Sequence, residues 1–131
     1  MTAQAVLDFV HEQRTSRGEA KVCRGWSDNQ LLIAVSNAIC NNTFGWVELD
    51  GKLAGFAFGI PRPHERVLDV TQVVCANTRA LAQLMLLFES HYRGWTLRGL
   101  RRKKAAEKQL VSYRRVNRFS QLTQLKATQL L

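Results

Sequence analysis

The residues best suited to chemistry on their own are three cysteines and three histidines. The cysteines form no Cys-x-x-Cys pair and each stands in an apolar neighbourhood, so we expect buried, reduced thiols. No histidine pairs with a cysteine at ligand spacing, and no catalytic signature surrounds any cysteine. We therefore predict no metal site and no Cys–His nucleophile. These residues are Cys23, Cys40, Cys75, His11, His64 and His91.

The second chemical feature is a basic run near the C-terminus, interleaved with Trp95, Tyr113 and Phe119. Residues 1–92 hold 8 Lys or Arg against 9 Asp or Glu, whereas residues 93–131 hold 11 against one. Cations beside aromatic faces suit a groove for single-stranded nucleic acid. A basic run also suits a solvated face, or one that binds an acidic protein partner, and charge does not choose between them. The run comprises Arg98, Arg101, Arg102, Lys103, Lys104, Lys108, Arg114, Arg115 and Arg118.

The elements that must position these residues belong to one domain, because 131 residues with 46% hydrophobic content suffice for a single core. No apolar run reaches the ~18 residues that cross a bilayer. The N-terminus lacks the pattern of a secretory signal. We expect no membrane partner and a cytoplasmic location, in a host cytoplasm or a virion if the protein derives from a phage.

Two amphipathic helices are predicted first. The pattern from Ala3 to Arg14 is typical of a helix. Ser27 and Gln30 form a capping box that begins the second helix, and Asn41-Asn42 ends it. Between the helices, Lys21 to Trp26 is expected to form a short extended segment.

From Phe44 onward, apolar residues recur at every second position, which predicts strands. Phe44 to Phe58 reads as a β-hairpin around Asp50-Gly51, the favoured pair for a type I′ turn. A loop follows from Pro61 to Glu65. Val67 to Cys75 is largely apolar and β-branched, which predicts a central strand covered on both faces.

The remaining elements complete a layered domain. Asn77 or Thr78 begins a third helix, Trp95 to Leu100 predicts a strand, Lys103 to Leu110 suits a basic helix, and Val111 to Phe119 suits an extended segment. The order predicts an α/β (α+β layered) fold in which helices flank a mixed, mostly antiparallel central sheet.

This order, with the segment Trp46-Val-Glu-Leu-Asp-Gly-Lys-Leu-Ala-Gly-Phe56, resembles the GNAT (N-acetyltransferase) superfamily over roughly residues 2–115. The resemblance implies a GNAT-like domain of residues 1–115, followed by a C-terminal tail, residues 116–131, that packs on the domain or on a partner. It implies acetyl-CoA or another acyl-CoA as the acyl donor and an amine as the acceptor. In such a domain, Val67 to Cys75 would splay from its neighbouring strand and open a slot for pantetheine.

The resemblance also implies which residues bind the cofactor. The backbone amides of Val73, Val74 and Cys75 would pair with the pantetheine arm. Where the family has a Gln/Arg-x-x-Gly-x-Gly/Ala loop, this chain has Ala76-Asn77-Thr78-Arg79-Ala80 without glycine. A helix N-terminus favours anions. The phosphates would therefore lie at Asn77, Thr78, Arg79 and Ala80.

The same resemblance implies catalytic roles. Asp69 would be the general base that deprotonates the amine, with Glu48 as the second candidate, and Tyr113 would protonate the departing thiolate. Solvent-facing or hydrogen-bonded positions for the carboxylates, and a packing role for Tyr113, are the alternatives.

Two functions therefore stay open. One is a small N-acyltransferase that uses acyl-CoA. The other is a GNAT-like binding or structural protein, as in some phage proteins, whose basic C-terminal face engages nucleic acid or an acidic protein partner. The sequence leaves the acyl acceptor and the oligomeric state open.

Overall fold

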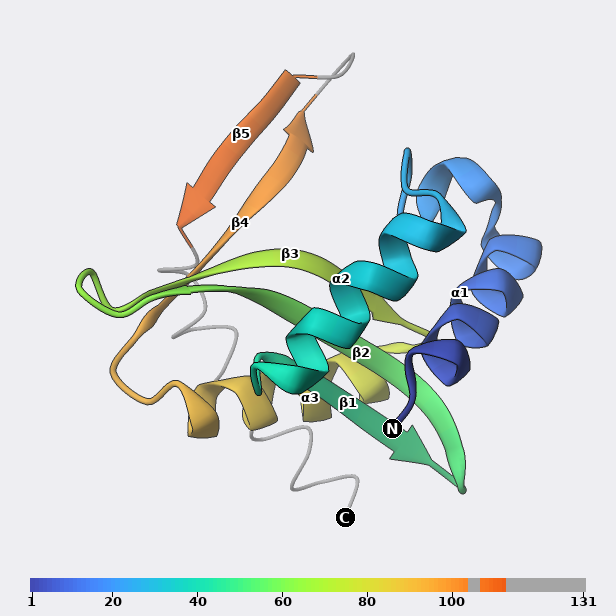
Figure 1. The fold of residues 1–131 in the computed structure, drawn as a ribbon, viewed down its shortest axis with the longest axis horizontal. Helices are drawn as coiled ribbons and strands as arrows, with labels where there is room; N and C mark the ends of the chain where they lie inside the picture. Colours follow the sequence, from blue (N-terminus) through green and yellow to red (C-terminus); the bar gives the residue numbers. More distant parts are fainter. Residues whose placement is uncertain (104–106, 113–131) are drawn as a thin grey trace.

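The structure is a computed structural model that describes residues 1–103 and 107–112 (Figure 1). The described strands form one sheet in the order β1-β2-β3-β4-β5. Helices α1 and α2 cover one face and α3 covers the other. The predicted α+β class, with a mixed and mostly antiparallel sheet, is confirmed. The elements are α1 (Ala3–Arg17), η1 (Glu19–Lys21), α2 (Asp28–Cys40), β1 (Phe44–Leu49), β2 (Lys52–Arg62), β3 (Val67–Cys75), α3 (Thr78–His91), β4 (Thr96–Lys103) and β5 (Glu107–Ser112).

Local signals begin and end the helices where the sequence places them. The Ser27 hydroxyl accepts from the Gln30 backbone, and the Gln30 side chain accepts from the Ser27 backbone, so the predicted capping box is present. Asn77 caps α3 by accepting from the backbone N–H of Ala80. The extended segment expected from Lys21 to Trp26 is wrong, because the chain there forms the end of η1 and a turn.

The hairpin of β1 and β2 is confirmed, including its turn. Asp50 and Gly51 have φ angles of 54° and 77°, and positive φ at both central positions defines a type I′ turn. Strand β2 runs further than expected, to Arg62. Pro61, expected in a loop, pairs with Leu68 of β3 within this extension.

The end of the described chain differs from the prediction. A basic helix was expected from Lys103 to Leu110, but Lys103 ends β4 and Glu107 to Leu110 belong to β5, which pairs antiparallel with β4. Residues 104–106 lie outside the described residues. The composition of this segment suits a helix. Pairing with β4 overrides that preference, because strand formation depends on neighbours more than on intrinsic propensity. Figure 1 shows this hairpin pointing away from the rest of the sheet.

A bulge in β3 changes which face its side chains occupy. Phe58 lies opposite Gln72 and Gly59 lies opposite Val70, so Thr71 has no partner on β2. Before the bulge, Val70 packs with the α3 cluster. The extra residue in the bulge reverses the alternation of faces along β3. Val74, four residues after Val70, therefore packs on the opposite face, with α1 and α2. The bulge thus places β3 in both cores.

Each face of the sheet has its own core. Phe56 and Phe58 stack under α1 and α2, where Phe56 is fully buried and also meets the edge of Phe9. On the other face, Leu84 and Phe88 of α3 pack on the sheet. These two cores hold the end of β3 in place between α1 and α3. The candidate site lies there.

Candidate functional site

A groove of about 610 Å³ lies at the C-terminal end of β3. Three segments far apart in the sequence form it: the end of α1 with the turn after η1, the second half of β3, and the start of α3. Its volume lies within the range of small-molecule sites. The lining residues are Arg17, Lys21, Val22, Cys23, Gln72, Val73, Val74, Cys75, Ala76, Asn77, Thr78 and Leu81.

The groove lies where β3 parts from β4. The two strands pair in parallel only from Val67 to Val70, opposite Thr96 to Gly99. The Thr71 bulge follows at once, and β3 continues to Cys75 while β4 turns into its hairpin with β5 (Figure 1). The second half of β3 therefore has no strand partner on this side within the described chain.

The backbone of β3 offers polar groups to this open side. In an antiparallel ladder, every second pair of residues exchanges hydrogen bonds. The N–H of Ala76 donates to the carbonyl of Ala54 at 2.8 Å, so Val74, two residues earlier, also pairs toward β2. The N–H and C=O groups of Val73 and Cys75 consequently face away from β2. Of the three residues expected to pair with pantetheine, only Val73 and Cys75 have backbone groups on the open side.

Arg17 is a groove residue that the sequence did not reveal. Its guanidinium donates to the carbonyl oxygen of Cys75 at 3.0 Å. The two residues are 58 positions apart, so only the packing of α1 against the sheet brings them together. The sequence offered one signal for this role, a basic residue in the last turn of α1. Basic residues are common at helix ends, so that signal does not single out a binding residue.

The start of α3 contains the residues expected to bind phosphate, and the structure separates them. Asn77 and Thr78 line the groove. Arg79 is exposed but is not among the lining residues. Ala80 is fully buried and its N–H is taken by the Asn77 side chain at 2.8 Å, so it has no donor left for a ligand.

Asp69, the predicted general base, is held by two arginines. Arg98 donates to it at 2.6 and 3.1 Å, and Arg62 donates to its second oxygen. The hydrogen bonds from Arg98 and Arg62 lower the Asp69 pKa from 3.8 to about 2. A carboxylate with so low a pKa is a weak proton acceptor at neutral pH. Asp69 lies in the paired half of β3, outside the groove lining.

The other predicted catalytic residues do not join Asp69. Glu48 is exposed on β1, and β2 separates that strand from β3. Neighbouring strands are about 4.8 Å apart, so two strand spacings, about 10 Å, separate Glu48 from the groove strand. Tyr113 lies outside the described residues.

The structure describes only part of the predicted basic face. Arg98 is engaged by Asp69 rather than free for a partner. Arg101, Arg102 and Lys103 belong to β4. Lys108 belongs to β5. Lys104, Arg114, Arg115 and Arg118 lie outside the described residues.

The three cysteines differ in their surroundings. Cys23 is buried and Cys75 is half-buried, and burial raises the pKa of each thiol to about 11 despite the nearby arginines. Cys40 is exposed, so the expectation that all three are buried is wrong for it. Cys40 is the last residue of α2.

Within residues 1–103 and 107–112, no cluster of three or more His, Cys, Asp or Glu side chains could hold a metal ion.

A second cavity, of about 290 Å³, lies beside the outer edge of β1. It is mostly aromatic, with Phe44 and Trp46 on the strand, Phe88 on α3 and Tyr92 directly after that helix. It is smaller than the β3 groove, and among the described residues its lining contains no Lys or Arg. Of the residues expected to do chemistry it includes His91, whereas the β3 groove includes Cys75, Asn77 and Thr78. The groove beside β3 is therefore the candidate site.

Comparisons with protein-family models, with curated proteins and with solved structures found no match for this chain. The resemblance to the GNAT superfamily stays a prediction.

In the part of the chain that the structure describes, every helix is too short or too polar to cross a bilayer.

Proposed function

We propose that this protein binds an acyl-CoA in the groove beside β3 and transfers the acyl group to an amine. The observation that carries the proposal is the parting of β3 from β4 after Val70, which leaves strand-edge hydrogen-bonding groups beside a groove. An extended arm with amide groups could pair there as a short additional strand. Pantetheine is such an arm.

The groove offers this arm contacts of the right kinds. Val73 would supply a donor and an acceptor, since its backbone groups face the open side. Val22 and Leu81 supply apolar walls. In this arrangement the thioester points toward Thr71, where the strands part, and the phosphates lie toward Arg17 and the start of α3.

Acyl transfer also requires the acceptor amine to lose a proton. Asp69 is poorly suited to take it, because Arg98 and Arg62 hold its pKa at about 2. The proposed reaction therefore relies on orienting an amine that reaches the groove unprotonated, with a backbone N–H polarising the thioester carbonyl. Tyr113 keeps its predicted role as the acid for the departing thiolate.

One observation favours a second candidate, a binding protein without turnover. Both carboxylates expected to act as the base fail in this structure, Asp69 through its ion pairs and Glu48 through its distance. In that case the groove would retain a ligand, and the basic C-terminal face would contact nucleic acid or an acidic protein.

Calorimetric titration with acetyl-CoA tests the binding step. Val73→Trp would fill the groove, and we expect it to weaken binding at least tenfold. Ile60→Trp is the matched control, because Ile60 is also an exposed β-branched strand residue, 59% accessible against 42% for Val73, but does not line the groove. Absence of binding at millimolar acetyl-CoA would reject the proposal.

A second measurement separates the two candidates. Release of free CoA thiol is followed with a thiol reagent in the presence of a panel of primary amines. Amine-dependent release that Val73→Trp abolishes supports the transferase. Binding of acetyl-CoA without release supports the binding protein.

The nucleic-acid version of the second candidate has its own test. Binding to single-stranded DNA or RNA should weaken steeply as salt rises, because counterions compete for phosphates. Neutralising Arg101, Arg102, Lys103 and Lys104 should reduce both the affinity and the slope of that salt dependence. An affinity that does not change with salt concentration would reject nucleic acid as the partner.

A further inference from the structure

The charges in the groove beside β3 are one-sided. Among the residues that the structure describes, its lining includes two cations, Arg17 and Lys21, and no carboxylate. This differs from the chain around it, since residues 1–92 hold nearly equal numbers of acidic and basic side chains. Both cations come from the end of α1 and from η1, on the same side of the groove. The site therefore has a positive side.

Arg17 has donors to spare. Its single hydrogen bond within the described chain, to the Cys75 carbonyl, uses one of the five N–H groups of a guanidinium. Arg14, one turn earlier, is different: its side chain is 13% exposed and donates to the carbonyls of Val22, Cys23 and Trp26. Arg14 thus holds the turn after η1 together, whereas Arg17 is exposed at the groove.

The other surfaces of the groove are apolar or neutral. Val73, Val74 and Leu81 line it on β3 and α3, and Val22 lines it after η1. A ligand that matches this distribution has an extended, uncharged arm and one anionic end. Two cations that line the same groove suit the two negative charges of a phosphate group better than the single charge of a carboxylate. The arginine fork also binds phosphate oxygens in pairs.

We propose that Arg17 and Lys21 determine specificity by binding a phosphate group at the end of the ligand's uncharged arm. The ligand class is a phosphorylated pantetheine, and the inference rests on the proposed function of the groove. The segment from Ala76 to Ala80, which follows β3, contains no glycine, and the cations of the groove lie on α1 and η1.

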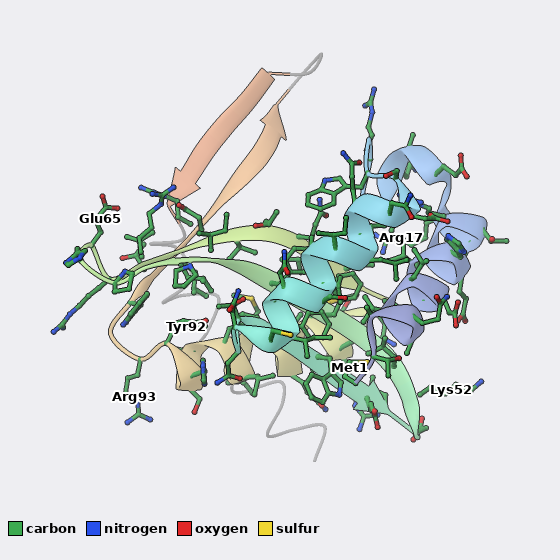
Figure 2. All side chains as sticks on the ribbon, viewed as in Figure 1. Met1, Arg17, Lys52, Glu65, Tyr92 and Arg93 are labelled. Carbon is green, nitrogen blue, oxygen red and sulfur yellow. The ribbon has the colours of Figure 1, made fainter. Side chains whose placement is uncertain are left out.

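Two probes that differ by one phosphate test this specificity. Calorimetry compares 4′-phosphopantetheine with pantetheine, and we expect the phosphate to tighten binding at least tenfold in the wild-type protein. Arg17→Ala with Lys21→Ala should bind both probes equally. Lys52→Ala is the control, since it removes the same charge at the β1–β2 turn, away from Arg17 (Figure 2), and should keep the preference.

Arg17→Lys separates charge from geometry. It retains the positive charge but loses the planar fork, so we expect it to keep part of the preference for 4′-phosphopantetheine. Circular dichroism and thermal melting establish that each variant is folded. Arg17 makes its hydrogen bond at an exposed position, so these variants should fold like the wild type.

The outcomes distinguish this inference from the proposed function. Equal binding of the two probes by the wild-type protein overturns the inference and leaves the proposed function standing. If neither probe nor CoA binds, the proposed function fails, and inorganic pyrophosphate then tests the cations alone. Pyrophosphate binding that the double variant loses supports a phosphate site; binding that the double variant retains overturns it.

Discussion

Replacing Asp69 with asparagine should destabilise the protein by removing the ion pairs that join β3 to its neighbours. Asp69 lies opposite Arg98 in the four-residue parallel pairing of β3 with β4, and opposite Ile60 of β2, two residues before Arg62. Its carboxylate accepts from both arginines. Asparagine keeps the shape of the side chain and loses the charge.

The size of the effect follows from the pKa of Asp69, which falls from 3.8 to about 2 in the folded protein. A difference of this size corresponds to at most about 2.5 kcal/mol of stability at neutral pH. Water screens part of it, because the side chain of Arg62 is 52% exposed and those of Asp69 and Arg98 are 23% and 26% exposed. We therefore expect a loss of about 1 kcal/mol.

Urea denaturation at pH 7 and at steps down to pH 3 measures this loss. Because the folded pKa is lowered, the stabilisation is complete above the unfolded pKa of 3.8 and disappears as the pH falls toward 2. The gap between wild type and Asp69→Asn should accordingly narrow below pH 4. In a double-mutant cycle, Asp69→Asn and Arg98→Gln should not be additive, because each substitution removes the same ion pair.

Glu12→Gln serves as the control, since Glu12 is exposed on α1 and makes no ion pair within the described chain. It should change stability little at any of these pH values. A gap between wild type and Asp69→Asn that stays constant from pH 7 to pH 3 would refute the reasoning, because the loss would then not come from the carboxylate charge. So would additive effects of Asp69→Asn and Arg98→Gln.

Three further predictions concern other parts of the fold. Ser27→Ala removes one half of the capping box and should cost about 1 kcal/mol in urea denaturation, with little change in the slope. Gly45→Ala places a methyl group 2.5 Å from the ring of Phe88, and should lower stability by about 1 to 3 kcal/mol in the same assay unless α3 shifts. A thiol reagent should label Cys40 at once in the native protein, whereas the buried Cys23, with a pKa of about 11, should react only when the protein unfolds; rapid native labelling of Cys23 would contradict its burial.

Local signals explain why much of the fold could be predicted. Asp50-Gly51 specifies its turn by the φ angles that both residues tolerate, and Ser27 with Gln30 specifies a helix start through two reciprocal hydrogen bonds. Each feature needs only residues that are neighbours in sequence. The β1–β2 hairpin and the start of α2 were therefore predicted correctly.

Features that depend on distant pairing were not predicted. The segment from Glu107 to Ser112 is a strand because β4 lies beside it. The bulge at Thr71 has no signal in the sequence of β3, because it depends on the register with β2. The candidate site also depends on contacts between segments that are distant in sequence. Asp69 was recognised as a strand carboxylate, but its ion pairs with Arg62 and Arg98 depend on the register of three strands.

The short connection between β3 and β4 has a consequence for how the protein opens. Four residue pairs, Val67 to Val70 with Thr96 to Gly99, join the β4–β5 hairpin to the three other strands, and an isolated two-stranded hairpin is marginally stable in water. We therefore expect the hairpin to detach before either helical layer unfolds. Hydrogen exchange at the amides of β5 would then report this local opening, and exchange at Phe56 would report global unfolding.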